Sequence, residues 1–195
     1  MSKRITVEQI ENIVIDSGVV YINYGVEGER LLAPVRGGNT FTVEGEIREI
    51  EVDGTRGKTK GLRRRIREDA NLAVNFMDLS LKNLNMALPG SKLDVAGKKL
   101  SSGWKITDED YLENVTLIGE DMKGEFKKIT IYNALADEGL EISMQDEDES
   151  VVEVHFSAHH KPDPTETDVL WDVEDITEIA EQVSGINTTS VGDKK

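Results

Sequence analysis

The chain has no cysteine, no long apolar run and a shortage of basic residues. The absence of cysteine excludes disulfide frameworks, thiolate metal sites and cysteine nucleophiles. The longest apolar runs are short stretches such as residues 19–22. They fall far below the roughly 20 residues that a membrane helix needs, so we expect no membrane segment. Residues 1–12 contain no apolar stretch of the signal-peptide kind, and synthesis in the cytoplasm is therefore expected.

The shortage of basic residues gives the chain a strongly negative charge. Lys and Arg number 23 against 38 Asp and Glu, and the formal net charge is -15. Such a charge repels polyanions and disfavours unassisted binding to nucleic acid or to an anionic membrane. The hydrophobic content of 37% is nevertheless that of a folded protein, and 195 residues suit one well-buried core with extensions.

Alternation of apolar and polar residues predicts a mainly antiparallel β fold. β-branched residues over 13–24 predict two short strands hinged at 16–18. Phe41, Val43 and Ile47 alternate with charged residues, and the region 39–78 reads as one long hairpin with a protruding loop. The alternation slips at Ile50 and Val52, which predicts a bulge or a change in what the strand faces.

The second half of the chain predicts an antiparallel meander, with one helix before it. We expect strands over 115–118, 127–134, 140–145 and 151–158. Helical spacing, with Asp78 or Ser80 as N-cap and Pro89-Gly90 as the stop, predicts a helix whose packing residues are Leu81, Leu84 and Leu88. One helix against many strands indicates a β-sandwich or barrel.

The composition changes after Pro162. We divide the chain into a β-barrel domain over 1–162 and an acidic C-terminal extension over 163–195. Within the extension, 172–183 is predicted to form a short acidic helix, followed by a polar tail.

One basic patch stands out in this acidic chain, and three interpretations compete for it. It can be a solvated face, a nucleic-acid-binding patch, or a surface that meets acidic residues of another copy. Nucleic-acid recognition is weakly supported, because no aromatic residue lies between Phe41 and Phe76 for base stacking. Opposite charges segregated along one chain favour head-to-tail pairing between copies. The patch comprises Arg56, Lys58, Lys60, Arg63, Arg64, Arg65 and Arg67.

The sequence has only weak matches to catalytic, nucleotide-binding and metal-binding motifs, so we expect no enzyme activity and no cofactor. Gly57-Lys58-Thr59 lacks the earlier glycine of a phosphate-binding loop, where Val52 stands, and no helix pattern follows it. The acidic run 146–149 lacks the spacing of a calcium loop. His155, His159 and Glu153 could hold zinc only if the strand bent. Residues two apart along a strand are already about 7 Å apart, and the two histidines are four apart, too far to share one metal ion.

Several blocks of sequence resemble the tail tube, or major tail, proteins of long-tailed bacteriophages. The blocks are Arg36-Gly37-Gly38-Asn39-Thr40-Phe41, then 53–64 (DGTRGKTKGLRR), 72–75 (LAVN) leading into 81–90 (LKNLNMALPG), and 153–159 (EVHFSAH) as a closing strand. The resemblance does not extend past Asp163.

This resemblance implies a β-barrel or sandwich subunit that assembles into hexameric rings. The rings would stack into a hollow tube around a tape-measure protein, end at tail-terminator and tail-tip proteins, and conduct DNA into the host without binding it specifically. The long hairpin loop would contact the neighbouring ring, and the protein would reside in the virion tail. An acidic lining would let DNA slide, and Glu44 and Glu46 are the candidates for the lumen face. A nucleic-acid-binding β module and a monomeric β-sandwich binding module remain the alternatives.

Overall fold

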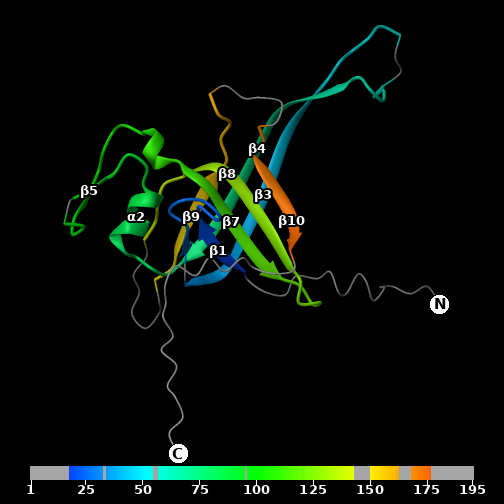
Figure 1. Ribbon diagram of the computed structural model, residues 1–195. Coiled ribbons are helices and arrows are strands. Elements are labelled where there is room, and N and C mark those ends of the chain that lie inside the picture. The colour runs from blue at the N-terminus through cyan, green and yellow to red at the C-terminus, as the bar shows by residue number, and fades with distance from the viewer. Residues whose placement is uncertain are drawn as a thin grey trace, which may run out of the picture.

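The computed structural model describes residues 18–32, 34–54, 57–94, 96–142, 150–162 and 168–176. The predicted mainly antiparallel β fold is confirmed, and the described residues include one α-helix (Figure 1). The strands are β1 (Val19–Ile22), β2 (Arg30–Leu32), β3 (Val35–Glu49), β4 (Arg63–Phe76), β5 (Lys92–Leu93), β6 (Leu100–Ser101), β7 (Leu112–Glu120), β8 (Phe126–Ala136), β9 (Val152–Ser157) and β10 (Trp171–Ile176), with the helix α2 (Leu81–Ala87) and the 3-10 turn η1 (Asp108–Asp110).

Strand β8 changes partner along its length and so folds the sheet over. The strand order is β2-β1-β7-β8-β9-β4-β3, with β10 also paired to β8. Residues 126–131 of β8 pair with β10, whereas Leu135 and Ala136 pair with β9. The two halves of the sheet therefore face each other, and β10 meets β3 where the Trp171 and Phe41 rings lie 5.7 Å apart. This arrangement is the expected sandwich-like enclosure of a core.

The core is built from the alternating residues of these two layers. Positions of period two point one way from a strand, so Leu72, Val74 and Phe76 of β4 lie together with the even-numbered residues of β9. The opposite layer supplies residues of β1, β7 and β8. The fully buried large side chains are Val20, Ile22, Leu32, Leu72, Val74, Phe76, Val115, Ile118, Ile131, Val152, Val154 and Phe156.

The predicted long hairpin is formed by β3 and β4. Their antiparallel ladder runs from Val35 opposite Phe76 to Glu49 opposite Arg63. A bulge interrupts it, because Glu46 pairs with Arg67 whereas Ile47 pairs with Arg65, which leaves Ile66 as an extra residue. This bulge lies on β4 and leaves the alternation of β3 in phase, so it is not the slip predicted at Ile50 and Val52; those two residues lie just past the end of β3 at Glu49.

Helix α2 begins and ends where the sequence predicts. The Ser80 side chain accepts a hydrogen bond from the Asn83 backbone N–H, and Gly90 with a φ of 74° follows the helix. Its innermost residues are Asn83 and Ala87. The three predicted packing residues Leu81, Leu84 and Leu88 are half-buried.

Two predictions of secondary structure are wrong. Leu140–Ile142, predicted as part of a strand over 140–145, is not a strand, because β8 already pairs directly with β9 and leaves no edge between them; 143–145 lies outside the described residues. The helix predicted over 172–183 is the strand β10 as far as Ile176, since Trp171 and Val173 pair with the N-terminal half of β8; 177–183 lies outside the described residues.

Other predictions stay open. The strand expected before Gly18 and its hinge at 16–17 lie outside the described residues. The division of the chain at residue 162 stays a prediction, although 171–176 pairs with the main sheet. In the described part of the chain, no helix has the length and apolarity needed to cross a membrane.

A small lobe, residues 90–94 and 96–107, stands beside α2 and contains the β5–β6 hairpin (Figure 1). Its base is held by Asp110, whose carboxylate accepts from the backbone N–H of Gly90 at 2.9 Å and from that of Thr107 at 2.7 Å. The Thr107 hydroxyl donates a third hydrogen bond at 3.0 Å. Partial burial acts to raise the pKa of Asp110, but these hydrogen bonds outweigh it and the pKa is lowered.

We predict that Asp110→Asn destabilises the protein in a pH-dependent way. A carboxyl whose folded pKa lies below its unfolded value stabilises the protein above the unfolded pKa and loses that contribution as pH falls through the folded pKa. The urea midpoint of the variant should therefore be lower at pH 7, and the difference should shrink below about pH 4. Glu109→Gln, an exposed neighbour, is the control. A difference that stays constant between pH 7 and acid would contradict this account of Asp110.

Candidate assembly interface

The distal part of the β3–β4 hairpin projects from the body as an arm, which we define as Glu46–Arg67 (Figure 1). Every described residue of the arm is exposed except Leu62, which is half-buried. At the other end of the same two strands, Leu72, Val74 and Phe76 are fully buried. The ladder therefore joins the base of the arm to the core through backbone pairing, while nearly all described side chains of the arm stay exposed.

The arm exposes large apolar side chains. Ile47 is 57% exposed and Ile66, the bulged residue opposite, is 51% exposed. Ile50 and Val52 follow at 49% each. Ile47 continues the alternation of Phe41, which packs against the core, and Val43, which is already 36% exposed, so Ile47 lies beyond the point where the core ends. A strand pair with an apolar stripe and no covering layer is typical of a surface that another chain covers.

Basic side chains crowd the arm without enough acidic partners. Between Glu46 and Arg67 the sequence has eight basic and four acidic residues. Arg48 lies directly opposite Arg64, and neither forms an ion pair with another described residue. Like charges opposite each other destabilise an isolated strand pair, so this pair is better suited to an acidic surface brought by a partner.

The remaining basic residues predicted as contact residues are also on the arm. Arg65 pairs with Glu68 at 2.7 Å, and Arg63 lies 4.0 Å from Glu49. Lys58 and Lys60 are exposed at the tip. Arg56 lies outside the described residues. The structure thus brings the described members of the basic patch together on one projection, and their contact with a neighbouring ring stays a prediction.

The two lumen candidates lie on the outer face of the β3–β4–β9 layer. Glu44 and Glu46 are exposed and stand opposite Asp69 and Arg67, on the face turned away from the core. Glu153 of β9 lies on the same face, because it alternates with buried residues. It contacts His155, which also reaches Glu138 at 3.1 Å. Sequence reasoning missed Asp69, Glu138 and Glu153 as members of this acidic face, although Glu153 alternates visibly with Val152 and Val154.

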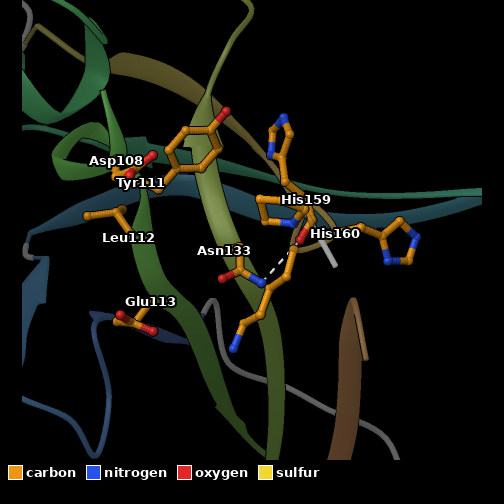
Figure 2. A pocket seen from close by; sticks show the side chains of 9 residues that line it. Asp108, Tyr111, Leu112, Glu113, Asn133, His159 and His160 are labelled. Carbon is orange, nitrogen blue, oxygen red and sulfur yellow. Dashed lines mark hydrogen bonds between the residues drawn. The ribbon is translucent and has the colours of Figure 1, made fainter. Parts of the chain in front are cut away.

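A cavity of about 350 Å³ lies between β7, β8 and the segment after β9 (Figure 2). The His159 ring meets Tyr111 edge-on with centroids 5.3 Å apart, and Asn133 donates to the His159 backbone carbonyl at 3.1 Å. His160 pairs with Asp168 at 3.0 Å. None of the nine lining residues is Ser, Thr or Cys, so this cavity has no side-chain nucleophile of those types.

The structure gives no support to the weak phosphate-binding and metal-binding motifs in the described residues. Gly57-Lys58-Thr59 lies at the arm tip, the strand β4 follows it instead of a helix, and the cavity beside it is lined by Glu49, Glu51 and Asp53. Those carboxylates repel phosphate. Among the described residues, no three His, Cys, Asp or Glu side chains are placed to share a metal ion. The acidic run 146–149 lies outside the described residues.

No protein-family model and no curated protein matches this chain. Among solved structures, a chain of the virion of a native gene transfer agent particle is similar at 8% identity and a TM-score of 0.39, over 74% of this chain and 92% of that one. A chain of the tail of the empty particle, which has C6 symmetry, is similar at 7% identity and a TM-score of 0.39, over 76% and 96%. Function must therefore be argued from the residues of this chain.

We predict that Arg64→Glu does not destabilise the isolated chain, although it reverses a charge. The new carboxylate lies opposite Arg48 and replaces a repulsive pair by an attractive one, a change of about 0.2–1 kcal/mol in favour of folding. Urea unfolding at low salt should show a midpoint equal to or above that of the wild type, and the gain should shrink at high salt. Lys82→Glu, on the exposed side of α2, is the control. A clearly lower midpoint would mean that Arg64 has a stabilising partner within the chain.

Proposed function

We propose that this protein is a structural subunit of a phage-type virion tail, which polymerises as stacked hexameric rings into a hollow tail tube. The observation that carries the proposal is the arm, a strand pair with exposed isoleucines and with two arginines, Arg48 and Arg64, that form no ion pair with another described residue. The blocks of sequence that resemble tail tube proteins include this hairpin and the helix after it.

A contact made by the arm is necessarily head to tail. The arm is one kind of surface, basic and apolar, and it does not complement itself, because two arms would repel each other. An acidic surface elsewhere on a second copy complements it, and the net charge of -15 shows that such surface is abundant. Contacts between two different surfaces of identical subunits generate rings when they close and filaments when they do not.

The acidic outer face supports a role as the wall of a channel for DNA. Glu44, Glu46, Asp69 and Glu153 outnumber the one arginine beside them, Arg67, which pairs with Asp69 at 2.8 Å, so this part of the outer face of the β3–β4–β9 layer keeps a negative charge. A negative wall repels the phosphates of a passing duplex, so DNA would slide through the lumen without specific binding. The partners implied are further copies of the chain, a tape-measure protein inside the tube, and tail-terminator and tail-tip proteins at its ends. The site of action is the virion tail.

We infer a structural and not an enzymatic role. The cavity in Figure 2 has no Ser, Thr or Cys in its lining, and its two histidines contact Tyr111 and Asp168, so no hydroxyl or thiol nucleophile stands beside a base there. The proposed function needs no cofactor. The two alternative functions predict different roles for the arm. A nucleic-acid-binding module would use it to bind DNA, and a monomeric binding module would leave it without a partner.

We predict that the purified protein forms hollow tubes at high concentration and that Ile47→Ser/Ile66→Ser abolishes them. The two isoleucines are more than half exposed, so their loss should leave the urea midpoint almost unchanged while it removes apolar area from the contact. Negative-stain electron microscopy is the measurement. Met122→Ser, which removes a side chain 52% exposed in the β7–β8 turn, is the control and should still form tubes.

Two results would contradict the proposal. One is a wild-type protein that stays monomeric at all concentrations. The other is arm-dependent binding of duplex DNA that weakens steeply with salt, as phosphate contacts require, since this outcome would favour the nucleic-acid-binding module.

A further inference from the structure

Trp104 is the most exposed large side chain among the described residues, at 103% of its reference area. The second tryptophan, Trp171, behaves ordinarily, because it packs against Phe41 and donates its indole N–H to Glu68 at 3.2 Å. Tryptophan is usually well buried and is enriched at protein interfaces, where its ring gives a large contact area. A Trp that is fully exposed in this way therefore points to a partner.

The backbone on both sides of Trp104 is clamped. A Cβ atom on Gly103 would lie 1.7 Å from the Gly90 carbonyl oxygen, and a Cβ on Gly90 would lie 3.0 Å from the Lys105 carbonyl oxygen. The segment 103–105 thus lies directly against Gly90, and Gly90 is itself held by Asp110 through its N–H. A side chain presented from a clamped backbone loses less conformational freedom on binding than one on a loose loop.

The lobe that carries Trp104 combines further exposed apolar side chains with several lysines. Ile106 is 51% exposed and Leu93 is 37% exposed, and both belong to the same lobe. Four lysines against one aspartate make the lobe basic. Asp94 is engaged, because its carboxylate accepts the backbone N–H groups of Lys98 and Lys99. Within the described part of the chain the lobe lysines form no ion pair. An apolar anchor inside a charged rim is the usual form of an interface hot spot.

We propose that the lobe is a second assembly contact, separate from the arm, in which Trp104 anchors a neighbouring copy of this chain. This inference rests on the proposed function. The occupant follows from charge complementarity, since acidic residues strongly outnumber basic ones outside the arm and the lobe. The lobe beside α2 also lies apart from the arm in Figure 1, so one subunit can use both surfaces at once. Two separate contacts per subunit are what an assembly needs to extend in two directions, around a ring and along a stack.

The test compares Trp104→Ser with Trp104→Phe. Sedimentation and negative-stain microscopy give the lowest concentration at which each protein assembles. Trp104→Ser should raise that concentration at least about 30-fold, the effect of losing an anchor of about 2 kcal/mol, whereas Trp104→Phe should restore much of the assembly. Because Trp104 covers nothing in the monomer, both variants should keep the urea midpoint of the wild type.

Fluorescence gives an independent readout. In a Trp171→Phe background Trp104 is the only tryptophan, so its emission should move to shorter wavelength on assembly and become less accessible to acrylamide. Normal assembly of Trp104→Ser, or a Trp104 that stays fully quenchable in assembled protein, would overturn the lobe contact and leave the proposed function standing. An emission shift seen only with anionic phospholipid vesicles would overturn it in favour of a membrane partner. A wild-type chain that never assembles would refute the proposed function, and the lobe contact with it.

Discussion

The antiparallel ladder between β3 and β4 is the interaction on which the rest of the structure depends. At one end its side chains form much of the core, with Leu72, Val74 and Phe76 fully buried, and at the other end the same two strands leave the body as the arm. Backbone pairing, interrupted by the bulge at Ile66, joins the core to the base of the arm, so the free energy gained by burying the core also holds that base in place. A loop of the same length without a ladder would have to be ordered by its partner, at an entropic cost for each residue. The paired base of the arm therefore carries less of this cost when a partner binds.

The charges are segregated, so that the isolated chain has basic surfaces and acidic surfaces in separate places. The arm and the lobe are basic in an otherwise acidic molecule, and each adds exposed apolar side chains, Ile47 and Ile66 on the arm and Trp104 on the lobe. Ion pairs on an exposed surface contribute little stability to a monomer, but opposite surfaces of different copies orient one another and exclude incorrect alignments. In the proposed tube, the acidic outer face of the β3–β4–β9 layer would face the passing DNA, and the basic arm and lobe would make the contacts between copies.

Much of the fold could be predicted from the sequence, because local patterns determine it. The alternation in β3, β4 and β9 and the N-cap at Ser80 are local signals, and the structure confirms them. Strand β10 was missed because three of its six residues, Asp172, Glu174 and Asp175, are acidic, and because its pairing with β8 joins segments more than forty residues apart in sequence. For the candidate interface, the basic residues of the hairpin were predicted from their clustering. The apolar stripe was not, since Ile47 follows the same alternation as core residues, and only the structure shows where the core ends. The exposure of Trp104 likewise has no signal in sequence.

The most direct test of the central claim is an intermolecular cross-link from the arm tip. Equal amounts of unlabelled and ¹⁵N-labelled protein would be dissociated, mixed, allowed to assemble and treated with a carbodiimide, which joins lysine amines to carboxylates in contact. Lys58 and Lys60 are exposed at the tip. If the arm binds a second copy, mass spectrometry will find these lysines joined to carboxylates in peptide pairs that combine the two isotopes. Cross-links of the tip lysines confined to pairs of a single isotope, in protein that has assembled, would contradict the account.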